Sequence, residues 1–119
     1  TPMRDPQDVA REILQEIYAP KSDKALGTLF AVFNDSEEAF RTLWPTWFLH
    51  IDFMPTGYKF TAAQTVDLIG TYQIALARLR AIKPELGNQA EATRLETSIV
   101  KWITYVKGRL RKDYQYEMP

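Results

Sequence analysis

The sequence contains no cysteine and only one histidine, His50, among its 119 residues. Without cysteine the chain can have no disulfide framework, no thiolate ligand for zinc and no cysteine nucleophile. A small domain without disulfides is typical of a reducing compartment, so we expect a cytoplasmic, intracellular protein. A single histidine leaves only carboxylates for metal binding, and no calcium-loop spacing of aspartates is present. The sequence therefore predicts neither a metal site nor any other cofactor.

Glycine clusters, an excess of one charge and long apolar runs are also missing. The five glycines are scattered singly, so the sequence has no glycine-rich phosphate loop. Lys+Arg and Asp+Glu both number 15, and a net charge of zero gives no general attraction to nucleic acid or to an anionic membrane. No apolar run approaches the ~18 residues of a membrane span. These absences disfavour nucleotide-dependent enzymes and predict no membrane span.

The composition that remains is that of an ordinary folded domain. The chain is 45% hydrophobic and 25% charged, which argues against disorder. Its length predicts one domain over residues 1–119, with loose tails at 1–4 and 113–119. Because the chain starts at Thr1 rather than at methionine, we expect it to be a fragment of a longer protein.

Start and stop signals divide the first part of the chain into three helices. Asp5-Pro6 is typical of a helix start, and Ala19-Pro20 ends this first helix. Ser22-Asp23 starts a second helix, Asn34-Asp35-Ser36 predicts a break, and a third helix then runs to Pro45. The apolar face of the first helix consists of Val9, Ile13, Leu14, Ile17 and Tyr18.

Two longer helices are predicted in the second part. Thr61 can form a capping box at the start of a helix over residues 62–83, whose broad apolar face predicts a largely buried central helix. Gly70, in its middle, would permit close approach of another helix. Asn88 caps a last amphipathic helix that ends at about Lys112. The sum is an all-α protein, an antiparallel bundle of four to five helices joined by short loops.

The segment 40–60 is unusually rich in aromatic residues, since it contains seven of the fifteen in the chain. Large rings contribute the most burial area per residue, so the segment belongs in a core or in an interface. Beyond Pro45 it fits either a helix or a short hairpin around residues 45–60. We favour the helix, because an isolated hairpin is only marginally stable and the rest of the chain is helical.

His50 and Asp52 are the only obvious acid–base pair. A carboxylate can orient a histidine as a general base. On a strand the two side chains would share a face, whereas on a helix they lie about 200° apart, since each residue turns the helix by ~100°. No serine is placed to complete a triad, so we expect no catalytic residue and no enzymatic activity.

The last helix has a basic end with aromatic residues between the charges. Such a surface could contact phosphates and stack bases, although cations at a helix C-terminus also stabilise the helix dipole. Binding of nucleic acid or of an acidic partner is therefore the alternative function. Its candidate residues are Lys101, Lys107, Arg109, Arg111 and Lys112.

The leading hypothesis is a small helical module for protein–protein interaction or assembly. Aromatic residues are enriched at interface hot spots, and a thin bundle cannot easily bury all seven rings of the segment 40–60. The partner would be another protein or a second copy of this chain. The candidate partner-binding residues are Trp44, Trp47, Phe53, Tyr58 and Phe60.

Overall fold

The computed structural model describes residues 5–43 and 60–118, with side chains for residues 5–35 and 60–118. This part of the chain is all-α, as the sequence predicts, and contains no strand. The helices and the one short 3₁₀ helix are α1 (Pro6–Tyr18), α2 (Asp23–Leu43), α3 (Ala62–Ile82), η1 (Lys83–Glu85) and α4 (Gln89–Tyr114).

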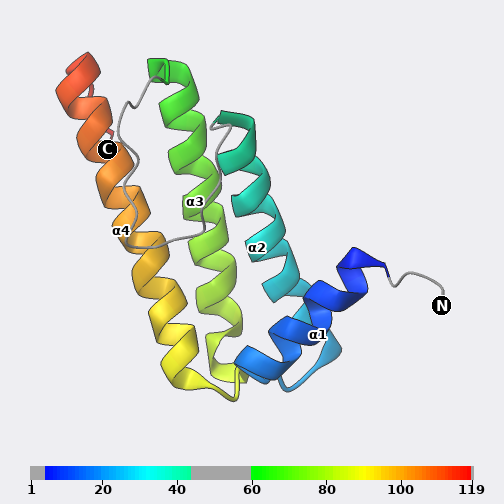
Figure 1. Cartoon of the computed structure of the whole chain (residues 1–119). Helices are drawn as coiled ribbons and strands as arrows, with labels where there is room; N and C mark the ends of the chain where they lie inside the picture. The colour runs from blue at the N-terminus through cyan, green and yellow to red at the C-terminus, as the bar shows by residue number, and fades with distance from the viewer. Residues whose placement is uncertain (1–4, 44–59, 119) are drawn as a thin grey trace.

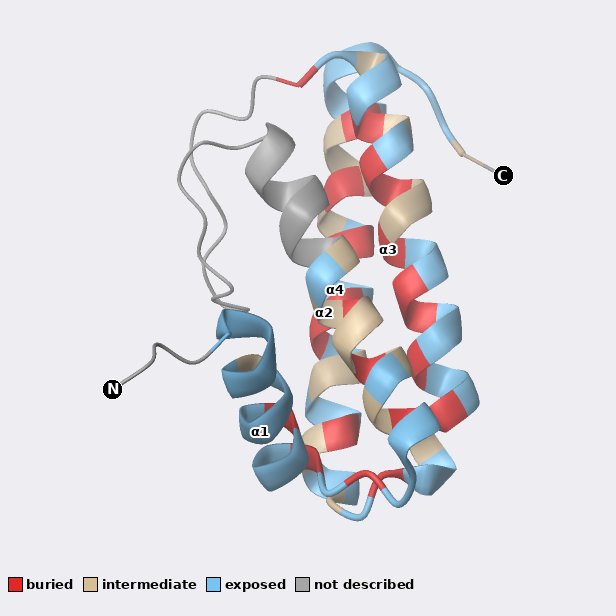
Figure 2. Cartoon of the chain, turned by 90° about the vertical axis from the view of Figure 1, so that its right-hand side faces the viewer, coloured by how far each residue is buried: buried red, intermediate tan, exposed pale blue. Residues whose placement is uncertain are grey.

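Three long helices form the body of the bundle. α2, α3 and α4 lie side by side, and neighbouring helices run in opposite directions, while the shorter α1 lies across the end where α2 begins (Figure 1). Buried residues line the surfaces at which the long helices face one another (Figure 2). α3 packs against both α2 and α4, which makes it the central helix.

The ends of α1 follow the sequence signals. The Asp5 carboxylate accepts a hydrogen bond from the backbone N–H of Gln7 at 2.9 Å, and Pro6 occupies the first turn, where its missing N–H has no cost. Ala19 ends the helix in the left-handed conformation, with φ 48°. This conformation is strained for alanine, so the surrounding contacts must hold it.

The predicted break at Asn34-Asp35-Ser36 is wrong, because α2 continues without interruption from Asp23 to Leu43. Asp35 does not cap a new helix. Its carboxylate instead pairs with the Arg78 guanidinium of α3 at 2.6 Å. Asp35 is a residue type that favours a helix start, which is why the local sequence predicted a break. Packing against α3 instead favours an unbroken helix.

α3 carries the centre of the core. Thr61 forms the predicted capping box with Gln64, at 3.1 Å and 3.0 Å, and eight residues of the helix are buried. The expected close approach of another helix at Gly70 is wrong, since a Cβ placed there would meet nothing within 4 Å. The buried residues of α3 are Thr65, Leu68, Ile69, Tyr72, Ala75, Leu76, Leu79 and Ile82.

A set of backbone hydrogen bonds ties the end of α1 to the loop between α3 and α4. The N–H groups of Gly87 and Asn88 donate to the carbonyl oxygens of Ala19 and Tyr18 at 2.8 and 3.1 Å. The Asn88 side chain caps α4 through Oδ1 and donates from Nδ2 to the Ile17 carbonyl at 2.9 Å. Asn88 therefore both starts α4, as predicted, and anchors α1.

The C-terminal end of α4 lies beside the start of α3. α4 extends to Tyr114, whose hydroxyl donates a hydrogen bond to the Phe60 carbonyl oxygen. Asp113 and Tyr114 are thus helical, and Met118 in the following tail packs against the core. These contacts close the bundle at the end opposite to α1 (Figure 1).

Candidate functional site

The aromatic segment and the acid–base pair of the sequence analysis fall largely outside the described residues. Trp44, Trp47, Phe53 and Tyr58 lie there, as do His50 and Asp52 and the choice between helix and hairpin. Phe60 is the one described member of the partner-binding set. Its side chain is only 6% exposed and packs in the core, so it contributes to folding.

The basic residues of α4 do not form one continuous cationic surface. Arg109 pairs with Asp113 at 2.9 Å, and Arg111 pairs with Glu117 at 3.5 Å. At ~100° per residue, Lys101 and Lys112 lie on one side of the helix, whereas Lys107 lies on the other. The predicted interaction of this helix with nucleic acid or an acidic partner stays a prediction.

The most unusual surface of the described chain is on α1. Only two of the five residues of its predicted apolar face, Leu14 and Tyr18, are buried. The other three form an aliphatic stripe, in which Val9, Ile13 and Ile17 are 36%, 49% and 40% exposed. A branched aliphatic side chain gains ~1.5–3 kcal/mol when fully buried, so three of them on one short helix leave much of that free energy unused.

The aliphatic stripe borders a pocket of about 480 Å³ between α1 and α2, which we call the α1–α2 groove. Ile13 and Ile17 form part of one wall, and Phe30 and Phe33 of α2 form the opposite wall. The Arg11 guanidinium lies 4.9 Å from the centre of the Phe30 ring, in a cation–π contact. The groove is therefore apolar inside and bounded by rings on its α2 side.

The charged residues along the aliphatic stripe are acidic. Glu12 and Glu16 follow Val9 and Ile13 by three residues each, which places them along one side of the stripe. Asp5 precedes Val9 by four residues and lies on the same side. The stripe thus combines apolar contact area with a negative rim.

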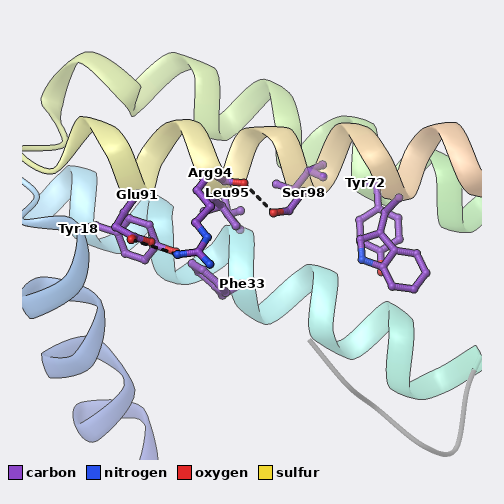
Figure 3. Close-up of a pocket in the computed structure, with 10 residues that line it drawn as sticks. Tyr18, Phe33, Tyr72, Glu91, Arg94, Leu95 and Ser98 are labelled. Carbon is purple, nitrogen blue, oxygen red and sulfur yellow. Dashed lines mark hydrogen bonds and ion pairs between the residues drawn. The ribbon is translucent and has the colours of Figure 1, made fainter. Parts of the chain in front are cut away.

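A second pocket, of about 290 Å³, lies deeper between the helices, and we call it the inner pocket (Figure 3). Its wall on α4 extends from Glu91 to Trp102, over three turns. The Tyr72 and Trp102 rings stack there, with centres 6.4 Å apart and planes inclined by 14°. The lining residues are Tyr18, Val32, Phe33, Tyr72, Glu91, Arg94, Leu95, Ser98, Ile99 and Trp102.

The polar groups of the inner pocket include an exposed ion pair and two tyrosine hydroxyls. The Arg94 guanidinium and the Glu91 carboxylate lie 3.6 Å apart near Tyr18, at one end of the pocket (Figure 3). Burial raises the pKa of the Tyr72 hydroxyl. Burial and the nearby Glu91 carboxylate raise the pKa of the Tyr18 hydroxyl, although Arg94 partly opposes this shift. Both hydroxyls are therefore neutral at physiological pH and can donate or accept a hydrogen bond.

Neither surface could be found from the sequence alone. The inner pocket combines residues of all four α-helices, and its members lie up to 84 positions apart, between Tyr18 and Trp102. The aliphatic stripe had one sequence signal, the width of the apolar face of α1, which exceeds what one small contact can bury.

The described residues bring no three or more metal-ligating side chains together as a metal site. Within the same residues, no helix combines the length and the apolar character needed to cross a membrane. Comparison of the chain with protein-family models, with curated proteins and with solved structures finds no match in any of the three. Function must therefore be inferred from the two surfaces themselves.

Proposed function

We propose that this domain is a protein-interaction module without catalytic activity, and that it binds an amphipathic helix of a partner protein. The helix lies along the α1–α2 groove, with its apolar face against the aliphatic stripe. The observation that carries this proposal is the exposure of Val9, Ile13 and Ile17 on one side of α1, beside an apolar groove. Such unpartnered apolar surface is typical of interaction sites.

The negative rim of the aliphatic stripe supports a basic partner. Asp5, Glu12 and Glu16 run along the stripe, and the nearby Arg11 is held over the Phe30 ring. A helix with lysine or arginine beside its apolar face would be attracted to this rim. The attraction would mainly raise the rate of association. A second copy of α1 would bring the same negative rim, which disfavours self-association through this face.

The two other candidate surfaces differ in the support that they have. Trp44, Trp47, Phe53 and Tyr58 remain sequence-based candidates for the same partner-binding role. For nucleic-acid binding by α4 we find no supporting observation, because Arg109 and Arg111 are ion-paired with carboxylates of the chain. The interaction module is therefore the function that the described surfaces favour.

A fluorescent model helix of leucine and lysine tests this proposal, with the same helix carrying glutamate for lysine as its counterpart. Anisotropy titrations should show saturable binding of the lysine helix, weakened by salt, and much weaker binding of the glutamate helix. Ile13→Glu and Ile17→Glu should each weaken binding at least tenfold, since a charge would enter an apolar contact.

Ile74 provides a matched control, because it is an isoleucine on α3, 55% exposed and outside the α1–α2 groove. Ile74→Glu should leave binding unchanged. The proposal is wrong if the lysine helix does not bind, or if Ile74→Glu weakens binding as much as Ile13→Glu. If the chain instead dimerises, and Ile13→Glu makes it monomeric in light scattering, the stripe is a self-association surface.

A further inference from the structure

The side of α3 that points away from the core is an exposed apolar surface. Ile74 lies at its centre and is 55% exposed, more than any other large hydrophobic side chain of the described residues. At ~100° per residue, the neighbouring positions within 60° of it on the helix include three alanines and a glycine, all exposed or half-buried. We call the five residues the outer face of α3: Ala63, Gly70, Ile74, Ala77 and Ala81.

α3 differs from an ordinary surface helix in its distribution of apolar residues. A helix with one side in solvent normally carries its charges there, whereas α3 is apolar on every side, which is typical of a helix covered all round. α2 and α4 cover two of its sides (Figure 1), and Tyr72, ~200° from Ile74, points to the inner pocket on the third. Of the described elements, none covers the fourth side, which is the outer face.

The outer face has a shape that is complementary to itself. Ile74 and Gly70 lie on adjacent turns of α3, so a protruding side chain stands beside a position without one. A Cβ at Gly70 would meet nothing within 4 Å, so packing within the chain does not require glycine there, and the space is open to another molecule. If two copies of α3 meet antiparallel, with a two-fold axis between these residues, each Ile74 lies over Gly70 of the other copy. The alanines would let the two helices approach to about 8 Å.

Two opposite charges along one edge of the outer face fit the same arrangement. Asp67 precedes Gly70 by three residues, and Arg78 follows Ile74 by four. The two-fold axis therefore brings Asp67 of each copy within ~1.5 Å, along the helix direction, of Arg78 of the other. Asp67 is exposed and takes part in none of the ion pairs of the described residues. Arg78 binds Asp35 through one Nη atom and has further N–H groups for a second carboxylate.

We propose that two copies of this chain form a dimer in which the outer faces of their α3 helices pack antiparallel. Ile74 of each copy packs over Gly70 of the other, and Asp67 pairs with Arg78 on both sides of the axis. This surface is separate from the α1–α2 groove, and the dimer would present two such grooves to partner helices. The contact follows one helix of ~30 Å, which gives a small interface, so the dimer should dissociate in the micromolar range.

Sedimentation equilibrium tests the apolar part of this contact. The chain should show a monomer–dimer equilibrium, and Ile74→Glu should weaken the dimer at least tenfold, because a charge would enter an apolar contact. Ile13→Glu is the matched control, since Ile13 is an isoleucine of similar exposure, 49%, on α1. It should leave the dimer unchanged. Circular dichroism would confirm that each variant is folded.

Charge reversal tests the symmetry of the dimer. Asp67→Arg alone should weaken the dimer about tenfold or more, because two cations would face each other, and Arg78→Asp should do the same with two carboxylates. An equimolar mixture of the two variants should dimerise about as well as the parent chain, since each copy then offers the opposite charge at both ends. Only a two-fold arrangement that places position 67 beside position 78 gives this complementation.

Cysteine cross-linking tests the antiparallel direction, and the natural absence of cysteine makes it unambiguous. Ala63 and Ala81 lie nine residues before and after the axis, so the same residue in the two copies is ~27 Å apart, whereas Ala63 of one copy faces Ala81 of the other. Under mild oxidation, Ala63→Cys and Ala81→Cys should each stay uncross-linked alone and should cross-link when mixed. A parallel pair would give the reverse pattern.

The proposal is overturned if the chain stays monomeric up to about 1 mM, or if Ile74→Glu dimerises as well as the parent chain. It is equally overturned if the mixture of charge variants does not restore the dimer, or if each cysteine variant cross-links to itself. A dimer lost in Ile13→Glu but kept in Ile74→Glu would assign self-association to the aliphatic stripe instead. Binding of the lysine helix by monomeric Ile74→Glu would show that the two surfaces act independently.

Discussion

Two glycines of this chain, Gly70 inside α3 and Gly87 in the loop before α4, differ in the space around them. A Cβ at Gly87 would lie 2.9 Å from the carbonyl oxygen of Ala19 and 3.1 Å from its Cβ. At Gly70 the same atom would meet nothing within 4 Å. Only Gly87 is therefore required by packing, because the end of α1 lies directly against it.

Substitution by alanine should consequently stabilise the fold at Gly70 and destabilise it at Gly87. Gly70→Ala should raise the free energy of unfolding by about 0.5–1 kcal/mol, since alanine is the better residue inside a helix. Gly87→Ala should lower it by about 1–3 kcal/mol, since the backbone of α1 must shift. Denaturant titrations measure both, and equal signs for the two variants would contradict the packing described here.

At the scale of whole helices, the sequence predicted elements better than it predicted their partners. The caps at Asp5, Thr61 and Asn88 were predictable because a cap depends on residues three or fewer positions away. The uninterrupted α2 was not, because Asp35 has a cap-forming side chain but pairs with Arg78, 43 positions further along. Long-range contacts of this kind decide whether a local signal is used.

The candidate sites show the same limit. An amphipathic pattern identifies the apolar face of α1, but whether Ile13 or Leu14 is buried depends on where α2 lies. Phe60 was assigned to a partner surface because it belongs to the aromatic segment 40–60, yet in the fold it lies just before α3 and packs in the core. The inner pocket requires the positions of all four α-helices, which no local pattern contains.

α3 and α4 are joined at the surface by a small ion cluster that should respond to acid. Glu96 accepts from Arg80 and from Lys83 at 2.9 Å each. These hydrogen bonds, first that of Arg80 and then that of Lys83, lower the pKa of the Glu96 carboxyl in the folded chain. The cluster therefore stabilises the fold above the pKa of the unfolded chain, and its contribution is lost as pH falls through the folded value.

Glu96→Gln should lower the melting temperature at pH 7, and the difference from the parent chain should shrink as the pH is taken from 5 toward 3. The effect should be small, because Arg80 is largely exposed and solvent screens the pair. Thermal melts at a series of pH values measure it. A melting difference that stays constant across this range would show that the cluster does not couple to stability.

Across the whole molecule, stability should be distributed unevenly. α3 is buried against both α2 and α4, whereas α1 is held by Leu14, Tyr18 and the hydrogen bonds at Gly87 and Asn88. An element with few buried contacts opens at lower free energy than the global unfolding. This arrangement suits a helix that also presents the aliphatic stripe, the surface for which we propose partner binding.

Hydrogen exchange should therefore show the amides of α1 opening well before those of α3. Asn88→Asp tests the link between α1 and the start of α4, because aspartate keeps the cap on α4 but cannot donate to the Ile17 carbonyl. In this variant the amides of α1 should exchange faster, while those of α3 stay unchanged. If the substitution instead removed the cap of α4, the amides of both helices would exchange faster. Equal protection of α1 and α3 in the parent chain would mean that α1 unfolds only with the whole bundle, and the aliphatic stripe would then be a rigid surface rather than the face of a separately opening helix.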